Sequence, residues 1–413
     1  MSAPDGTSAQ LSLDDSALKR ISKAFDRASA AVHARGSYDP SMLSDPDISP
    51  LVSETMAALS GAIGSTVRQS DMPAAMRAKL ERSTFIFSGF KTHTELSAVS
   101  RLLSKDGVKT PFDTFMREVK AINRDYNVNY LRAEYNFAVH SSRSAALWER
   151  FSKDADRYYL QYRTAGDERV REDHRPLHDI TLPFDDPFWA EYFPPNGWNC
   201  RCTAVRVRRS KYTPSDHDKA MAAGERATTS LDKHGNNRAA IFRFNPGAQE
   251  TLFPPRHPYY KVPQADRQTI TAAVEKVAAN KTLRKTAVEN LKVFQSKPPV
   301  KKVIDGEEVD VLFDSKTTSH IANDIAINKN FLWKDLSAKL QHILKQAPLV
   351  AHEPNTKTLE KPSARHYYYF ECKEGNEVFY LAVEENLVEK TGRHFFRLYS
   401  ITKTLRNTAI LYK

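Results

Sequence analysis

The sequence predicts a multidomain α+β protein: a mostly α-helical N-terminal half, a loop-rich α+β core, and a C-terminal α+β domain. Three observations support this class. The chain has 413 residues, well above the roughly 150 of a typical domain. Apolar residues recur at helical spacing through most of the first 151 residues. Aromatic and β-branched runs near the C-terminus are typical of strands.

The N-terminal part is predicted to be a tail followed by helices. Residues 1–12 are small and polar, which predicts a disordered tail. Residues 13–105 form a helical region whose first helix begins near Asp15. Three prolines and several turn-forming residues in 38–50 predict a linker within it.

Residues 106–262 are predicted to form the central domain. A helix opens at Pro111, because proline is tolerated at the first helical position. A long amphipathic helix follows over residues 127–151. Strands are expected from Tyr158 and from Thr203. The irregular connection between these strands is unusually long, and long connections inside a compact domain are often functional.

Residues 263–413 are predicted to form a third domain, with helices followed by a small antiparallel sheet. Asp305 and Gly306 are expected to form the turn of a hairpin. The expected helices are 266–295, 316–328 and 333–347, and the expected strands are 367–372, 378–383 and 395–402.

Composition limits the possible classes. The net charge of +11 favours polyanionic partners such as nucleic acid. Three cysteines, two of them separated by a single residue, cannot make the disulfide framework of a small secreted protein, so a reducing compartment is expected. The start of the chain has no signal-peptide pattern, and no apolar run approaches the roughly 20 residues that span a bilayer. No membrane partner is expected.

Two histidines four residues apart and two cysteines two apart lie in the long connection. His174, His178, Cys200 and Cys202 offer the four nitrogen and sulfur donors of a tetrahedral Zn²⁺ site. The sequence therefore suggests a structural zinc ion. In the alternative interpretation, the histidines hydrogen-bond the loop backbone and the cysteines pack as small hydrophobic residues.

Four ordered blocks of uncommon residues surround these donors. The first is Tyr-Arg-Thr-x-Gly-Asp-x-Arg-Val-Arg-x-x-His, from Tyr162 to His174. The second, Asp-Asp-Pro-Phe-Trp, ends at Trp189, and the third, Pro-Pro-Asn-Gly-Trp-Asn-Cys-Arg-Cys, ends at Cys202. The last, Phe-Asn-Pro-Gly, ends at Gly247. In these blocks the chain closely resembles the phage Mu F-like minor head, or head morphogenesis, protein family.

The resemblance covers about residues 110–250. It implies a minor capsid protein that joins the portal and procapsid during head assembly and can travel inside with packaged DNA. The implied partners are the portal and other capsid or scaffold proteins. The implied location is the virion head, with the bacterial host cytoplasm during assembly. One departure is Asp179, where many relatives have glycine.

Several residues of the blocks are expected to hold the loop rather than to react. Phe188, Trp189 and Trp198 are predicted to bury it. A hydrolase triad is the rival interpretation, but no serine lies in a nucleophile-elbow context. The polar residues predicted to form a buried ion-pair network are Arg163, Asp167, Arg169 and His174.

The C-terminal domain carries a second set of candidates. It resembles phage-associated nucleases of the barnase, EndoU, colicin and RelE-like class through a Thr-Ser-His helix entry and a last strand ending at Thr402. Such a metal-independent ribonuclease needs no cofactor. We assign His320 as acid/base, Lys316 as a phosphate-binding cation, and Ser400 and Thr402 as donors, with Arg397 in addition. Further histidines of this domain that could take part are His342, His366 and His394.

Three functions fit these observations. The first is a structural head protein carrying a ribonuclease effector domain that acts on RNA. The second is a purely structural virion protein whose C-terminal module binds nucleic acid or capsid partners without catalysis. A free-standing ribonuclease toxin fits less well, because it would not need the resembling segment.

Overall fold

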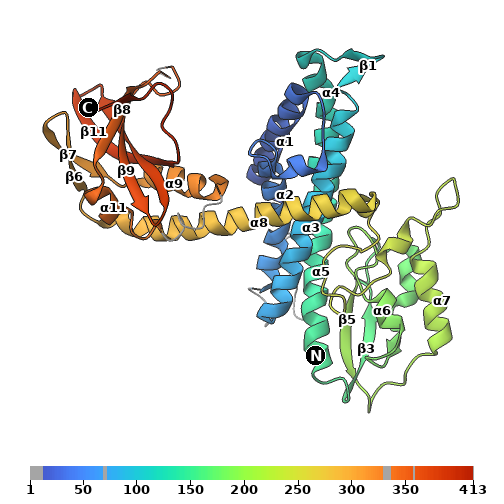
Figure 1. Ribbon diagram of the computed structural model, residues 1–413. Coiled ribbons are helices and arrows are strands. Elements are labelled where there is room, and N and C mark those ends of the chain that lie inside the picture. The colour runs from blue at the N-terminus through green and yellow to red at the C-terminus, as the bar shows by residue number, and fades with distance from the viewer. Residues whose placement is uncertain (1–12, 68–71, 329–335, 357–358, 413) are drawn as a thin grey trace. The chain divides into compact units, whose positions relative to one another are not determined.

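The computed structural model describes residues 13–67, 72–328, 336–356 and 359–412 (Figure 1). The predicted tail, residues 1–12, lies outside the described residues. The chain divides into two compact units, residues 1–277 and 278–413. Helix α8 (Gln264–Lys292) contributes residues to both units. The predicted α+β class is confirmed, with helices concentrated in the N-terminal half.

Five long helices build the first unit. Helix α1 (Asp15–Arg35) begins where the sequence predicts, because the Asp14 side chain accepts a hydrogen bond from the Ser16 amide. It ends at Gly36, which has a φ of 72°. The helices that pack with it around one apolar core are α2 (Ser49–Val67), α3 (Ala74–Ser100), α4 (Phe112–Arg124) and α5 (Leu131–Ser152), and the first part of α8 adds Ile270 and Val274 to this core.

Short elements interrupt this helical pattern. The predicted linker contains a 3-10 helix, η1 (Pro40–Ser44). A small hairpin, β1 (Ser104–Lys105) and β2 (Val108–Lys109), stands where the sequence analysis placed the end of a helix. Its turn consists of Asp106 and Gly107, both with positive φ. A dipeptide of this kind favours a tight hairpin turn, so the signal was present and was missed.

The predicted helix over 127–151 begins as a π-helical segment, η2 (Asp125–Tyr130), which joins α4 to α5. The segment carries Asn127, which is fully buried and donates a hydrogen bond to Glu95 over 3.0 Å. Beside it, Lys91 Nζ lies 3.0 Å from Glu134 Oε2, and both side chains are almost completely buried. The helical half of the unit therefore contains a buried cluster of charged groups.

The central loop region forms a second layer of the first unit. Strand β3 (Tyr158–Arg163) pairs antiparallel with β5 (Thr203–Arg208) and with β4 (Thr181–Leu182), in the order β4-β3-β5. Both predicted strands are thus confirmed. Short helices η3 (Glu172–Leu177) and α6 (Phe188–Tyr192) lie within the connection. Helix α7 (His217–Ala227), where the sequence analysis expected no helix, covers the same core.

The remainder of the first unit is a largely irregular segment that returns to the helical core. It contains two short 3-10 helices, η4 (Ala239–Phe242) and η5 (Pro258–Tyr260). The stacked rings of Phe87 and Phe253, 3.7 Å apart, join α3 to this segment. The segment therefore closes the core rather than acting as a loose linker.

The second unit is a curled seven-stranded sheet covered by helices. The predicted Asp305–Gly306 hairpin is confirmed as β6 (Val300–Ile304) and β7 (Glu307–Leu312). The order of strands is β12-β8-β9-β10-β11-β7-β6, with β11 and β7 parallel. The other strands are β8 (Leu349–Pro354), β9 (Ala364–Glu374), β10 (Glu377–Val388), β11 (Arg393–Thr402) and β12 (Ile410–Leu411). The sheet thus joins the predicted hairpin to the three predicted strands, and it adds β8 and β12, which were not predicted.

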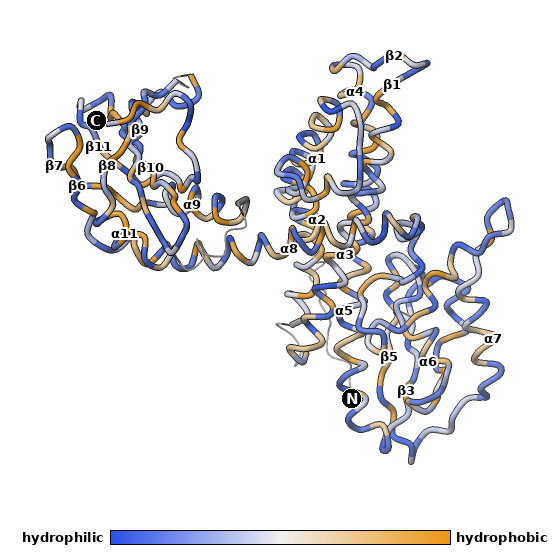
Figure 2. The backbone as a smooth tube through the Cα atoms, viewed as in Figure 1, coloured by the Kyte–Doolittle hydropathy of each residue, from blue (hydrophilic) through white to orange (hydrophobic). Residues whose placement is uncertain are grey.

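Helices of the second unit share one apolar core with this sheet. Helix α8 is followed by η6 (Val293–Ser296), and α9 (Ser315–Asn328) and α11 (Leu340–Gln346) match two predicted helices. Residues 329–335, at the start of the predicted helix 333–347, lie outside the described residues. Figure 2 shows hydrophobic and hydrophilic residues mixed along the helices and strands, as expected for elements with one face in a core. No helix in the described part of the chain combines the length and apolar character needed to cross a bilayer.

A β-bulge changes which residues of β11 share a face. Leu398 pairs with Val383, whereas Ser400 pairs with Ala382, the preceding residue of β10. Strict alternation predicts that Ser400 and Arg397 lie on opposite faces. Because Arg397 pairs with Glu384, two residues from Ala382, the bulge places Arg397 and Ser400 on the same face.

Candidate metal centre and polar clusters

Three of the four predicted metal donors lie together in the central loop region. His174 is on the short helix η3, and Cys200 and Cys202 lie just before strand β5. All three side chains are buried, with exposed fractions of 3%, 3% and 7%. Their donor atoms lie within 4.8 Å of one another, and the described residues contain no other such group of three or more histidine, cysteine or acidic side chains.

The distances suit a tetrahedral metal ion. His174 Nδ1 lies 3.8 Å from Cys200 Sγ and 3.7 Å from Cys202 Sγ. With Zn–N near 2.0–2.1 Å and Zn–S near 2.3 Å, tetrahedral angles place nitrogen and sulfur about 3.6 Å apart. The three side chains could therefore hold Zn²⁺ with little movement. Two thiolates and one imidazole leave one of four positions to another ligand.

The electrostatics of the group favour one thiolate. A hydrogen bond from the Cys202 thiol holds the pKa of the Cys200 thiol well below its usual range, and His174 acts in the same direction against the effect of burial. The pKa of Cys202 is raised, first because its proton is shared with Cys200 and then by burial. A deprotonated sulfur is the form that binds metal.

His178, the fourth predicted donor, is not part of this group. Its Nδ1 accepts a hydrogen bond from the Thr164 amide over 3.2 Å, and its Nε2 lies 3.2 Å from Arg163 Nη1. The next residue, Asp179, has a φ of 67° and forms an ion pair with Arg163. The left-handed turn that glycine would favour is therefore kept by an aspartate, which tolerates this conformation.

The loop's ion pairs differ from the network that the sequence suggested. Asp167 binds the two terminal nitrogens of Arg201, each over 2.6 Å, and it also accepts a hydrogen bond from the Arg169 amide. Arg163 pairs with Asp179 instead. These side chains are between about a third and three fifths exposed, so they form surface pairs beside the cysteines. Arg171, Arg169 and Arg201 line a small pocket that reaches the three donors.

The aromatic residues of the blocks support the loop, as predicted. Phe188 and Trp189 are fully buried, and Trp198 packs against Phe137 of helix α5. The last block closes on the same core. The Asn245 amide donates to the Trp189 carbonyl over 3.0 Å, and a Cβ at Gly247 would lie only 2.3 Å from a Trp148 carbon. Glycine is therefore required there by close packing.

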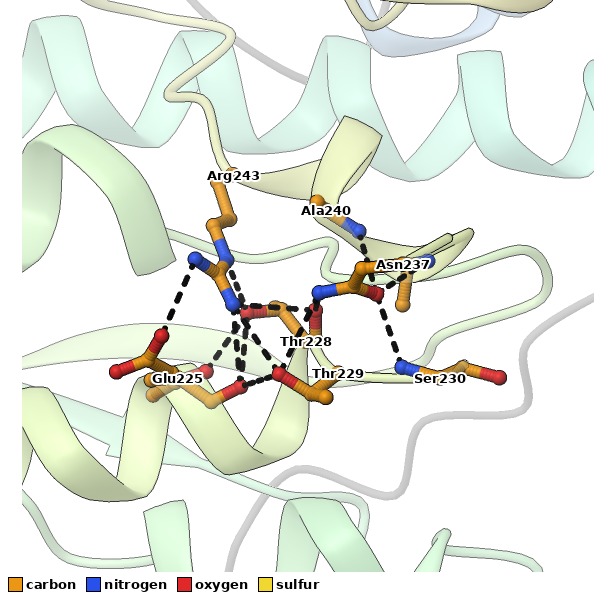
Figure 3. Close-up of polar contacts among 9 residues, drawn as sticks. Glu225, Thr228, Thr229, Ser230, Asn237, Ala240 and Arg243 are labelled. Atoms are coloured by element: carbon orange, nitrogen blue, oxygen red, sulfur yellow. Dashed lines mark hydrogen bonds and ion pairs between the residues drawn. The ribbon is translucent and has the colours of Figure 1, made fainter. Parts of the chain in front are cut away.

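A polar network orders the turn after helix α7 (Figure 3). The Asn237 side-chain oxygen accepts hydrogen bonds from the amides of Ser230 and Ala240, and its nitrogen donates to the Thr228 carbonyl. Arg243 Nε donates to Thr228 Oγ1 over 2.8 Å, and its guanidinium lies 3.7 Å from Glu225. These contacts join the turn to the end of α7, so the network is structural.

In the second unit, the predicted catalytic residues are spread over helix α9 and strand β11. Lys316 is exposed at the start of α9, and His320, one turn later, has its ring 4.3 Å from the ring of Tyr399. Burial, followed by nearby Lys361, lowers the pKa of His320. Thr402 donates to the Thr404 carbonyl, and Ser400 is half-buried. The predicted catalytic residues therefore do not form one cluster, and the contact between His320 and Tyr399 is the one that joins α9 to β11 here.

Arg397 belongs to a buried network centred on Glu384. Its Nε lies 3.4 Å from Glu384 and its Nη1 lies 3.0 Å from Asp314. Glu384 also accepts hydrogen bonds from Tyr367 and Asn386, each over 3.1 Å. Arg397 and Glu384 are 5% and 7% exposed. Because these groups already serve one another, Arg397 is better placed to support the sheet than to bind a substrate.

Lys361 extends this network toward solvent, and sequence reasoning missed it. Its Nζ contacts the Tyr399 hydroxyl, lies 3.3 Å from the Tyr367 hydroxyl and lies 3.6 Å from Glu384. The lysine is in the connection before β9, whereas its partners are on three neighbouring strands. No local sequence pattern joins them.

Glu385, the next residue of β10, is held on the opposite face of the sheet by two histidines. His366 Nδ1 lies 3.0 Å from Glu385 Oε2, and His394 Nδ1 lies 2.5 Å from Glu385 Oε1. Both histidines were among the candidates from the sequence. What sequence could not show is that one carboxylate joins them.

Comparison with known protein families finds a match, and it covers the segment that contains the His174, Cys200 and Cys202 group. Residues 108–205 match the family model described as "Phage Mu protein F like protein". This matched range contains His174, Cys200 and Cys202, so the resemblance drawn from the sequence is supported there.

Two curated proteins show similarity to the chain. "Putative capsid assembly protein F" of Escherichia phage Mu is 41% identical over 75 residues, which are 18% of this chain and 16% of that protein. "Mu-like prophage FluMu F protein" of Haemophilus influenzae is 34% identical over 110 residues, which are 25% of each. The alignments thus span a quarter or less of these relatives. No solved structure matches.

Proposed function

We propose that this chain is a phage or prophage capsid assembly protein, a minor head component that acts at the portal and procapsid. The observation that supports this most strongly is the matched range 108–205, which is similar to capsid assembly protein F of phage Mu. Its partners would be the portal and other capsid or scaffold proteins, and packaged DNA. It would reside in the virion head, and in the host cytoplasm during assembly.

The test is genetic. Deletion of the gene from the encoding phage should abolish infectious particles, and the full chain supplied from a plasmid should restore them. A chain carrying Trp189→Ala should fail to complement, because it removes the buried support of the matched segment. Lys233→Ala, an exposed position, is the matched control and should complement fully. Normal particle yield from the deletion phage would contradict the proposal.

We further propose that residues 106–262 act as the head morphogenesis domain and that it carries structural zinc. His174, Cys200 and Cys202 would hold the ion, as their nitrogen–sulfur distances allow. When bound, zinc would tie the short helix η3 to the start of β5. The sequence assignment of His178 as a fourth ligand receives no support from its contacts with Thr164 and Arg163.

Metal analysis of the purified full chain tests this proposal. About one zinc per chain is expected, and Co²⁺ in its place should give the absorption of thiolate-bound cobalt. Cys200→Ser should abolish both signals. His178→Ala should retain them, since this residue lies outside the group. A metal-free wild-type protein that takes up neither ion would overturn the proposal.

As a second function, we propose that residues 263–413 form a metal-independent ribonuclease effector domain. Two observations favour it. Residues 278–413 hold 22 Lys and Arg against 16 Asp and Glu, a net charge of +6 by subtraction, which favours a polyanionic substrate. The unit also presents half-exposed histidines on its sheet. The sequence assigns His320 as acid/base with Lys316, Ser400 and Thr402, and Arg397 in support.

Incubation of the full chain with total RNA or tRNA, without divalent metal, tests the ribonuclease proposal. Cleavage by the wild-type chain is expected. Salt-dependent RNA binding without cleavage would select the alternative, a structural virion protein with a nucleic-acid-binding module. If the chain neither binds nor cleaves RNA, RNA is not its partner.

A further inference from the structure

The cluster around Glu385 spans three neighbouring strands of the second unit. His366 is on β9, Glu385 on β10 and His394 on β11. The carboxylate is 11% exposed, whereas the two imidazoles are 44% and 48% exposed. Tyr368 donates a further hydrogen bond to Glu385 over 3.3 Å. The carboxylate is therefore buried beneath the two histidines, whose imidazole rings are exposed to solvent.

The hydrogen bonds fix which nitrogen of each ring is available. A carboxylate only accepts, so each Nδ1 that contacts Glu385 carries a proton. The Nε2 atoms are then the proton-transfer atoms: a neutral ring offers a base there, and a protonated ring offers an acid. In the described part of the chain, neither Nε2 atom takes part in a hydrogen bond. One carboxylate thus orients two histidines for acid–base work.

The separation of the rings argues against a shared metal ion. Among the described residues, the donor atoms of His366, Glu385 and His394 do not all lie within 4.8 Å of one another. The two imidazoles bind opposite oxygens of the carboxylate, and this arrangement holds them apart. Two separated proton-transfer groups are what an in-line displacement at phosphorus needs, one for the attacking oxygen and one for the leaving oxygen.

Aromatic rings lie beside the histidines on the same face of the sheet. His352 pairs with Tyr368 across β8 and β9, and their rings are stacked with centroids 6.3 Å apart. Phe396 is directly opposite Glu385 in the register, and its ring lies 6.1 Å from that of Tyr368. Both residues are half-buried: Phe396 also packs against the apolar core of the unit, and the His352 ring lies 5.0 Å from that of Tyr412. Such rings are platforms on which single-stranded bases stack.

We propose that His366 and His394 are the general base and general acid of an RNA-cleaving site, with Glu385 as a positioning residue. This inference rests on the proposed ribonuclease function and assigns its proton-transfer pair. Nε2 of one histidine takes the proton of a ribose 2′-OH, and that oxygen bonds to phosphorus. The P–O5′ bond breaks, and the other histidine gives its Nε2 proton to O5′. The products are a 2′,3′-cyclic phosphate and a free 5′-OH, with no net redox change.

This assignment competes with that of His320. His320 lies against Tyr399, beside Lys361 and the Glu384 network. Glu384 and Glu385 are consecutive in an extended strand, so their side chains point to opposite faces of the sheet. Substitutions can therefore separate the two sites.

Single-turnover cleavage of a labelled single-stranded RNA by the full chain is the test. His366→Ala and His394→Ala should each slow cleavage about 10²- to 10⁴-fold, the usual contribution of general acid–base catalysis. His234→Ala, at an exposed histidine of the first unit, is the control and should cleave at the wild-type rate. Binding of a 2′-O-methyl RNA of the same sequence should change less than about twofold in all variants, since its 2′ oxygen cannot react.

A substrate with sulfur in place of O5′ identifies the acid. Sulfur leaves without protonation, so this substrate should restore cleavage in the variant that lacks the acid and not in the one that lacks the base. A merely structural role would not produce that asymmetry. Glu385→Gln should lower the rate with binding unchanged. The Gln amide nitrogen donates a hydrogen bond to Nδ1 of one ring, so the proton of that neutral ring moves to Nε2, which can then no longer act as a base.

Three results would overturn the assignment, and they differ in what they leave standing. Wild-type rates in His366→Ala and His394→Ala, with loss in His320→Ala, would refute it and retain the ribonuclease. Equal loss with no rescue by the sulfur substrate would reduce the histidines to a structural role. No cleavage by the wild-type chain would remove the proposed ribonuclease and this inference together.

Discussion

The candidate functional residues of the two units differ in their burial. In the first unit, His174, Cys200 and Cys202 are at most 7% exposed, and Lys91 and Glu134 are buried in the helical core. In the second, His366 and His394 are nearly half exposed while Glu385 beneath them is covered. Buried donors suit a structural ion that holds a loop, whereas exposed imidazoles suit a reaction with a large substrate. The following predictions test this contrast, from the largest expected effect to the smallest.

Removal of metal should have the largest effect, and only in the first unit. Structural zinc contributes directly to folding free energy. A strong chelator should destabilise residues 1–277 on the order of 5 kcal/mol, roughly 10–20 °C in melting temperature. Calorimetry of the full chain should show that transition move while the transition of residues 278–413 stays in place. Parallel shifts of both, or no shift, would break the contrast.

Removal of the buried lysine should come next. Lys91→Met leaves Glu134 charged in the core, and breaking a buried pair costs about 3–5 kcal/mol. Lys79→Met is the matched control, because Lys79 pairs with Glu250 at the surface and such pairs contribute at most about 1 kcal/mol. Urea unfolding followed by tryptophan fluorescence measures both. Equal losses would show that burial does not set the cost.

The same cluster predicts a pH dependence. Burial raises the pKa of Glu95 to about 7, against the opposing effect of Lys91. The folded state therefore holds a proton that the unfolded state releases near pH 4.5, so stability falls as pH rises from 4.5 to 7. The loss is about 3 kcal/mol. Glu95→Gln should remove most of this slope between pH 5 and pH 8, and an unchanged slope would contradict the raised pKa.

Within the second unit, disturbing Glu384 should cost more stability than disturbing its neighbour Glu385. Arg397→Met should cost about 2 kcal/mol, because Glu384 loses a charged donor in a buried site. Glu385→Gln should change the free energy of unfolding by less than about 0.5 kcal/mol, since its two histidine partners are nearly half exposed to water. Thermal unfolding of both variants measures the difference. A larger loss for Glu385→Gln would make its cluster structural.

The smallest effect concerns the turn in Figure 3. Asn237→Ala removes a side chain that serves Ser230, Ala240 and Thr228, and the cost should be about 1–2 kcal/mol. Lys233→Ala, an exposed residue of the same turn, should be neutral. Limited proteolysis near residue 233 should be faster only in the asparagine variant.

Sequence predicted most of the long elements because their patterns are local. Asp14 and Gly36 bracket the first helix, and Asp305 with Gly306 marks a hairpin. Helix α7 was missed between irregular segments, although Asp216 caps it in the ordinary way. The shared face of Arg397 and Ser400 depends on a bulge, which simple alternation does not predict.

The candidate sites were predicted only in part, because spacing does not give direction. Cys200, Cys202 and His174 come together in one group, as the sequence predicted. His178 instead contacts Thr164, next to the left-handed turn at Asp179. The pairing of His366 with His394 depends on strand order, which brings β9, β10 and β11 together. Such contacts between distant residues arise only from the tertiary fold.

The central proposal is that one chain is built into the phage head and carries both units there. Mass spectrometry of purified DNA-filled particles tests it most directly. Peptides from residues 13–277 and from residues 278–413 should both be present, in similar amounts and at a low copy number relative to the major capsid protein. Particles that contain neither set of peptides, at every stage from procapsid to mature head, would contradict the account.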